Sequence, residues 1–132
     1  MINASPLLRR ALLADTIFSG VGAAGMTLDA GMLAPLLNLP EGLLRETGLI
    51  LIAYTLLVGW LATRSSLPKG LVMAVIAINA AWTLASIALL LSGAVSPNLL
   101  GEIAIVAQAI ATGVFAELQY IGVRRSASAV AA

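Results

Sequence analysis

Two reactive residue types are missing from this chain, which contains neither cysteine nor histidine. The absence of cysteine excludes disulfide bonds, thiol chemistry and iron–sulfur clusters. The absence of histidine removes the commonest zinc ligand, the usual haem ligand and the most frequent general base. We therefore expect no metal site, no cofactor and no catalytic activity, so the chain is predicted not to be an enzyme.

Charged residues are also scarce, at 10% of the 132 residues, whereas 61% are hydrophobic. A soluble domain has roughly 25% charged and 45–50% apolar residues. So large an apolar surplus does not suit a soluble domain of this length, because its surface would have to be mostly polar. The chain is therefore expected to be embedded in a lipid bilayer, which is its predicted partner. The net charge of +1 gives no indication of nucleic-acid binding.

Four apolar segments are predicted to be membrane-spanning helices, at residues 7–27, 43–63, 71–95 and 99–123. Each has about 21–25 residues, which is enough for a helix to cross roughly 30 Å of hydrocarbon. Helices also satisfy their backbone hydrogen bonds within the segment, as lipid requires. The fold class is therefore predicted as all-α: a polytopic membrane protein whose single domain is an up-and-down bundle of four transmembrane helices.

The connections between the spans are rich in turn-forming residues. Residues 65–70 and 96–98 combine serine, proline, glycine and asparagine, as short turns do. The first connection, residues 28–42, is longer and contains two prolines, so a short interfacial helix or a re-entrant turn is expected there. Residues 126–132 are small and are expected to form a disordered tail.

The basic residues are distributed unevenly around the spans. With four spans, both termini and the second connection share one side, and six of the seven basic residues fall on that side. These six are Arg9, Arg10, Arg64, Lys69, Arg124 and Arg125. Because positively charged loops stay in the cytoplasm, both termini of this multi-pass protein are predicted to be cytoplasmic.

Two carboxylates, Asp15 and Glu117, depart from this pattern because they lie inside predicted spans. A lone carboxylate in hydrocarbon costs at least about 2.5–3.5 kcal/mol on insertion scales, so it must be protonated, paired or hydrated. Counting about 1.5 Å per residue places both at a depth close to that of Asn79 and Tyr54. Since the first and last helices of such bundles are commonly neighbours, Asp15 and Glu117 are expected to share a proton or to flank Asn79. Pairing with an arginine from the interface is the alternative.

Further polar and aromatic side chains lie near this level. They are Ser19 in the first span, Trp82 and Thr83 in the third, and Tyr120 in the fourth. The whole set is a candidate site for a ligand or a proton, because intramembrane ionisable residues are commonly functional. The alternative is that these side chains only form the hydrogen bonds that hold helices together.

The first span contains closely spaced small residues, including Gly20, Gly22 and Gly25. The run matches G-x-G-x-x-G, but it lacks the strand–turn–helix setting of a dinucleotide site. Small residues let helix backbones approach closely. We therefore interpret these glycines as a helix-packing face, which suits a larger membrane complex or self-association.

Several short motifs resemble the DoxX-like group of small four-span bacterial membrane proteins. They are Arg9-Arg10 before the first span, Phe18-Ser19-Gly20 within it, Leu39-Pro40 before the second, and the stretch from Gly48 to Gly59 that ends near Arg64. The chain lacks the lysine expected late in the first span and the cysteine that some redox-linked relatives use. The resemblance implies a protein of the bacterial inner membrane, associated in some members with respiratory or sulfur redox complexes. Residues 115–125 also resemble uncharacterised bacterial four-span proteins.

The sequence is compatible with three functions. The first is a structural or accessory membrane protein with no activity of its own. The second is a small proton-coupled carrier built on Asp15, Asn79 and Glu117. The third is a redox accessory subunit that holds a quinone-like or other lipophilic ligand near Trp82 and Tyr54.

Overall fold

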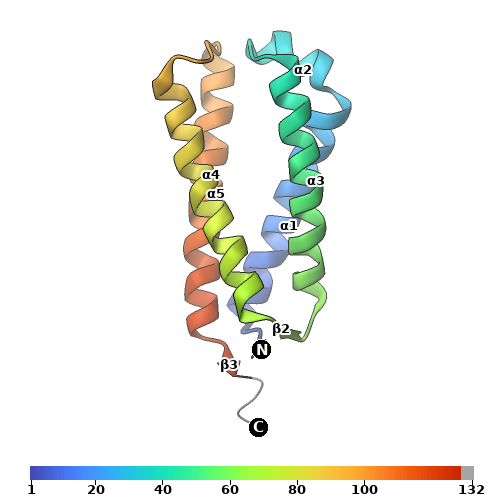
Figure 1. Cartoon of the computed structure of the whole chain (residues 1–132), viewed down its shortest axis with the longest axis vertical. Coiled ribbons are helices and arrows are strands. Elements are labelled where there is room, and N and C mark those ends of the chain that lie inside the picture. The colour runs from blue at the N-terminus through green and yellow to red at the C-terminus, as the bar shows by residue number, and fades with distance from the viewer. Residues whose placement is uncertain (129–132) are drawn as a thin grey trace.

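The computed structural model describes residues 1–128 and contains a bundle of four long helices with a short helix between the first two (Figure 1). The helices are α1 (Pro6–Leu28), α2 (Ala30–Leu37), α3 (Glu41–Thr63), α4 (Lys69–Ser92) and α5 (Leu99–Arg124). All four long helices are long and apolar enough to cross a membrane. The predicted all-α bundle of four long apolar helices is thereby confirmed, and of the short helix or re-entrant turn expected in the first connection, the structure has a short helix, α2.

Local chemistry explains where the helices begin and end. The Ser5 and Asn98 side chains accept hydrogen bonds from the first turns of α1 and α5, as N-cap residues do. Helix α4 is followed by Gly93, whose φ of 75° lies in the left-handed region that glycine tolerates. This cap ends the third span at Ser92 rather than at residue 95, so the prediction was too long there.

Three two-residue strands close the end of the bundle at which the described chain begins and ends. Strand β1 (Ile2–Asn3) pairs antiparallel with β2 (Ser66–Leu67) on one side and with β3 (Ala127–Ser128) on the other. We call this the terminal end and the opposite one the α2 end (Figure 1). The predicted tail is therefore partly wrong, because Ala127–Ser128 are paired in β3; residues 129–132 lie outside the described residues.

The main hydrophobic core lies towards the terminal end. Its fully buried apolar side chains come from α1, α3, β2 and α4, and are Leu8, Leu12, Val58, Leu61, Leu67, Val72 and Val75. Helices α1 and α5 approach closely here, since a Cβ atom on Gly122 would lie 2.7 Å from the Leu8 Cα. Small residues at such crossings are typical of membrane bundles.

The glycines of α1 that the sequence predicts as a packing face make looser helix contacts than Gly122 does. A Cβ on Gly20 would lie 3.5 Å from Thr55, and one on Gly22 would lie 3.7 Å from Leu51, so both glycines face α3 at ordinary contact distance. A Cβ on Gly25 would meet nothing within 4 Å. The tight contact between α1 and α3 is instead at Gly48, where a Cβ would lie 2.8 Å from the Thr27 backbone nitrogen.

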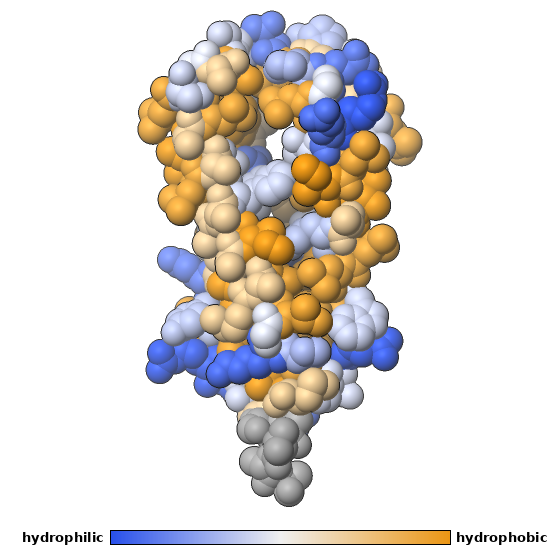
Figure 2. All heavy atoms as spheres, in the orientation of Figure 1, coloured by the Kyte–Doolittle hydropathy of each residue, from blue (hydrophilic) through white to orange (hydrophobic). Residues whose placement is uncertain are grey.

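The four helices form two pairs that diverge towards the α2 end (Figure 1). Helix α1 packs mainly on α3 and α4 mainly on α5, with α1 and α5 joining the pairs. At the α2 end, α2 connects them: the Asn98 backbone N–H donates to the Leu37 carbonyl at 3.1 Å, and the Asn98 amide donates to the Leu36 carbonyl at 2.8 Å. Apolar side chains cover the middle of the molecule and polar ones gather at its two ends (Figure 2).

Candidate functional site

A buried carboxylate connects all four long helices. Asp15 of α1 is 0% exposed, and its Oδ1 accepts a hydrogen bond from the Ser19 hydroxyl at 2.9 Å. Its Oδ2 accepts from the Tyr54 hydroxyl of α3 at 2.5 Å, the Asn79 amide of α4 at 3.0 Å and the Gln119 amide of α5 at 2.8 Å. We call these five residues the Asp15 cluster.

The two amides of this cluster have a determined orientation. Because carboxylate oxygens only accept, the amide nitrogens of Asn79 and Gln119 must face Asp15. The Asn79 amide also donates to the Gln119 Oε1 at 3.0 Å, which fits the same orientation. The cluster is thus one carboxyl group surrounded by donors, and an ionised carboxylate can accept from all of them.

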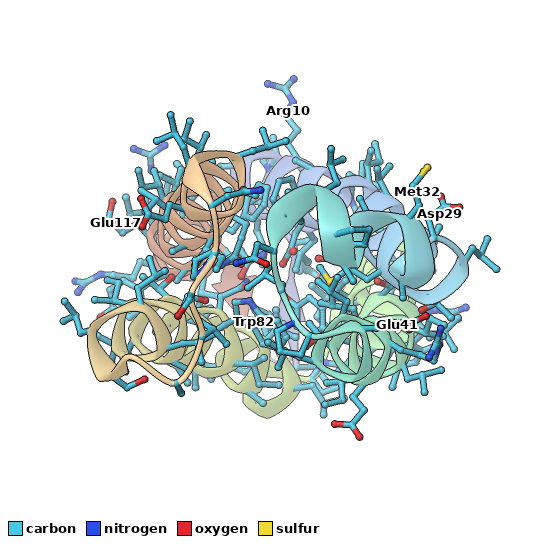
Figure 3. All side chains as sticks on the ribbon, turned by 90° about the horizontal axis from the view of Figure 1, so that it is seen from above. Arg10, Asp29, Met32, Glu41, Trp82 and Glu117 are labelled. Carbon is cyan, nitrogen blue, oxygen red and sulfur yellow. The ribbon has the colours of Figure 1, made fainter. Side chains whose placement is uncertain are left out.

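Basic side chains do not take part in the cluster. Within residues 1–128 the one ion pair joins Glu41 and Arg45, on an exposed turn of α3. Arg9 instead donates to the backbone carbonyls of Ala62 and Arg64, at the end of α3. Arg10 points away from the bundle (Figure 3). The alternative in which an interfacial arginine pairs with Asp15 is therefore not realised among the described residues.

Glu117 does not meet Asp15, so the predicted pairing of these two carboxylates is wrong. Glu117 is exposed and lies on the outside of the bundle (Figure 3), whereas Gln119 is 0% exposed. Glu117 and Gln119 are two residues apart on α5, which at about 100° per residue places them roughly 200° apart around the helix. Only one of these two side chains can therefore face the inside of the bundle. In the sequence, Gln119 shares a helical face with Gln108 and Thr112, and this spacing is the signal that could have identified Gln119.

Tyr120 is likewise outside the cluster. It is exposed near the terminal end, with the Arg124 guanidinium 5.9 Å from its ring centre. Trp60 makes the same kind of contact with Arg64 at 5.3 Å. Exposed aromatic residues beside basic ones are typical of a membrane–water interface.

A second group of polar contacts joins α4 and α5 nearer the α2 end. The Trp82 indole donates to the Gln108 Oε1 at 2.8 Å, and the Gln108 amide donates to the Ser86 hydroxyl at 2.8 Å. The Thr83 and Thr112 hydroxyls lie 2.7 Å apart. Trp82 and Thr83 therefore lie near the Asp15 cluster without touching the carboxylate, and Gln108 is a polar residue that the sequence-based site did not include.

A cavity of about 720 Å³ lies between the two helix pairs. Its wall is mostly apolar, and its polar lining residues are Ser19, Tyr54, Asn79, Trp82, Gln108 and Thr112. A neighbouring cavity of about 410 Å³ towards the α2 end shares Gly22, Met26, Trp82 and Gln108 with it. Figure 2 shows the surface hollowed between the two helix pairs in this half of the molecule.

The Asp15 cluster closes the cavity at its inner end. Along α1 the lining runs from Ala14 to Met26, which is roughly 18 Å of helix at 1.5 Å per residue. Phe18 of α1 and Phe115 of α5 meet edge to face, 5.6 Å between ring centres, where these two helices adjoin. Helices α3 and α4 make little contact with each other, so the hollow faces the surroundings between them.

Comparisons with protein-family models, curated proteins and solved structures find no significant match to this chain. The resemblance to the DoxX-like group therefore stays a prediction. In residues 1–128 no three acidic side chains gather where a metal ion could be held.

Proposed function

We propose that this chain is a non-catalytic, accessory integral membrane protein that binds a small lipophilic molecule between its helix pairs. The cavity of about 720 Å³ carries this proposal. Ligand pockets are typically about 300–1,000 Å³, mostly apolar, with a few polar groups that orient the ligand. This cavity has that composition, with its polar groups at the Asp15 cluster and along the seam between α4 and α5.

The position of the cavity favours a ligand that arrives from the membrane. The cavity opens between α3 and α4, so an apolar molecule from the bilayer can enter it and regain the contacts that an empty space forfeits. The hollow lies between helices that are long and apolar enough to span a bilayer, where lipophilic molecules concentrate. Tyr54 and Trp82 both line it, which supports the lipophilic-ligand hypothesis that the sequence suggests.

The carrier and the purely structural role receive less support. A proton-coupled carrier that uses Asp15 and Glu117 together has no shared site, because Glu117 is exposed on the outside. A purely structural role that depends on the glycines of α1 binding a partner is weakened, since Gly20 and Gly22 face α3 of the same chain. An accessory role in a larger complex remains compatible with ligand binding.

Filling the cavity is the direct test. Leucine at Gly22 would enter both cavities, and a Cβ there meets only ordinary contacts, so Gly22→Leu should fold and lose binding. The control is Ala53→Leu, which places a leucine side chain on the exposed side of α3. Both are made in a Trp60→Phe background, which leaves Trp82 as the single tryptophan and the reporter of the cavity.

Binding is measured as quenching of Trp82 fluorescence by ω-bromooctanol in bilayers of zwitterionic lipid. We expect saturable quenching in the background protein and in Ala53→Leu, and at least about tenfold weaker binding in Gly22→Leu. Quenching that rises linearly and equally in all three proteins would mean that the probe only dissolves in the lipid. That result would refute the proposed function.

We also propose that the protein lies in the bacterial inner membrane with its terminal end in the cytoplasm. The six basic residues at that end and the contacts of Trp60 and Tyr120 with arginines support this orientation. Alkaline phosphatase fused to either terminus should be inactive, because the enzyme matures only outside the cytoplasm. The same enzyme inserted between α4 and α5 should be active, and the reverse pattern would overturn the orientation.

A further inference from the structure

The polar lining of the cavity directs its hydrogen atoms away from the cavity. The Ser19 and Tyr54 hydroxyls both donate to Asp15. The Asn79 amide donates to Asp15 and to Gln119, which uses both of its N–H groups. A ligand beside this part of the wall therefore finds no free donor.

The seam between α4 and α5 is arranged in the same way. The single N–H of the Trp82 indole donates to Gln108. The Gln108 amide donates to the Ser86 hydroxyl and, at 2.9 Å, to the Ile105 carbonyl, so its two N–H groups are used as well. The Thr112 hydroxyl donates to a carbonyl of its own helix at 3.0 Å. Each polar side chain of the cavity wall has its hydrogens engaged within the protein.

Acceptor lone pairs, in contrast, are left over. Because the Asn79 nitrogen faces Asp15, the Asn79 Oδ1 points away from the carboxylate, and it makes no hydrogen bond with any residue from 1 to 128. Asn79 is only 3% exposed and lines the cavity, so this oxygen is an unpartnered polar atom in a nearly buried side chain. Ser19 and Tyr54 each donate their one hydrogen inwards, which leaves their oxygens able to accept.

We infer that the cavity selects a lipophilic molecule whose polar head donates hydrogen bonds or carries a positive charge, such as an alkylammonium. This inference rests on the proposed function. The Asn79 Oδ1 would accept from the head group, and the Asp15 carboxylate directly behind Ser19, Tyr54 and Asn79 attracts a cation through a region of low dielectric constant. The alkyl part would occupy the apolar remainder of the cavity.

The same wall disfavours two other classes of head group. A carboxylate or phosphate would meet lone pairs and a like charge, with no donor to receive it. A quinone, whose ring oxygens only accept, would also leave its oxygens unpartnered, and an unmet buried polar group costs about 1–3 kcal/mol. The quinone-like ligand considered from the sequence is therefore less suited to this wall than an amine or an alcohol.

The test compares three probes that differ only in the head group: ω-bromooctylamine, ω-bromooctanol and ω-bromooctanoate. Quenching of Trp82 is measured in the Trp60→Phe protein in zwitterionic bilayers, at a pH where the amine is protonated and the acid ionised. We expect affinity to fall from amine to alcohol to carboxylate, with at least about a tenfold difference between the two charged probes. The net charge of +1 would by itself favour the anion, so the overall charge of the protein does not produce this order.

Two variants that each remove one carboxylate locate the source of the preference. Asp15→Asn should bring the amine-to-carboxylate ratio close to one, whereas Glu117→Gln removes the same charge from the outer face of α5 and should leave the ratio unchanged. If Asp15→Asn does not fold, the ratio in the Trp60→Phe protein and in Glu117→Gln still tests the inference. Equal saturable binding of all probes, or tighter binding of the carboxylate, would overturn the selectivity and leave the proposed function standing. Absence of saturable binding by any probe would refute both.

Discussion

The two ends of this bundle differ in how completely they are filled. At the terminal end, leucine and valine side chains from four elements are fully buried, and three short strands tie the first residues to the α3–α4 connection and to the end of α5. At the α2 end the helix pairs diverge around the cavities, and the core is a small group around Ala30, Leu39, Leu44 and Ile105. One end therefore supplies most of the packing, and the other is free to hold a ligand.

The Asp15 cluster lies where these two regions meet. Its donors come from all four long helices, so it fixes their relative positions at one level. It is also the inner wall of the cavity, through Ser19, Tyr54 and Asn79. One polar layer can therefore both hold the helices together and recognise a ligand.

The largest effect expected from a single small change is at the crossing of α1 and α5 near the terminal end. In Gly122→Ala the new Cβ would lie 2.7 Å from the Leu8 Cα, so the two backbones must separate. Overpacking typically costs about 1–3 kcal/mol, and a backbone neighbour places this variant at the upper end. We expect a clear loss of stability in unfolding by SDS, followed by the circular dichroism of the helices.

The matched control for that change lies at the hollow end. A Cβ on Gly25 meets nothing within 4 Å, so Gly25→Ala should be tolerated and should gain up to about 1 kcal/mol from the better helix propensity of alanine. If both variants lose the same stability, the contrast between a filled end and a hollow end is wrong. If Gly122→Ala is neutral, the close approach of α1 to α5 is wrong.

Much of this architecture follows from hydrophobicity and charge, because a bilayer permits few other conformations for long apolar segments. The starts of all four long helices fall within two residues of the predicted spans, and α2 is one of the two conformations, a short helix or a re-entrant turn, expected for its connection. The three strands were not, because pairs of residues such as Ile2–Asn3 and Ala127–Ser128 carry no periodic pattern and form only because the fold brings them together.

The candidate site was predictable only in part, because the sequence gives the depth of a residue along its helix but not the direction in which its side chain faces. Depth along a helix can be counted, so Asp15, Tyr54 and Asn79 were correctly placed at one level. Which side of a helix faces the bundle depends on how that helix is rotated, and α5 has polar residues on two sides. The charge of Glu117 favours it as the partner of Asp15, yet the neutral Gln119 is the residue of α5 that donates to Asp15. The cavity could not have been predicted, since it depends on how far the helix pairs diverge.

A smaller effect is expected from removing one hydroxyl at the boundary between the two ends. Tyr54→Phe deletes one of the four donors to Asp15 and keeps the ring that lines the cavity. Hydrogen bonds between membrane helices contribute about 0.6 kcal/mol on average and at most about 1.7, and a bond to a carboxylate belongs at the upper end of that range.

Tyr120→Phe makes the same chemical change on an exposed side chain, so it should alter the free energy of unfolding in SDS by less than about 0.5 kcal/mol. Equal effects of the two variants would mean that the Tyr54 hydroxyl is not held by Asp15. A loss in Tyr54→Phe alone would place the stabilising contact at the level where the filled end gives way to the cavity.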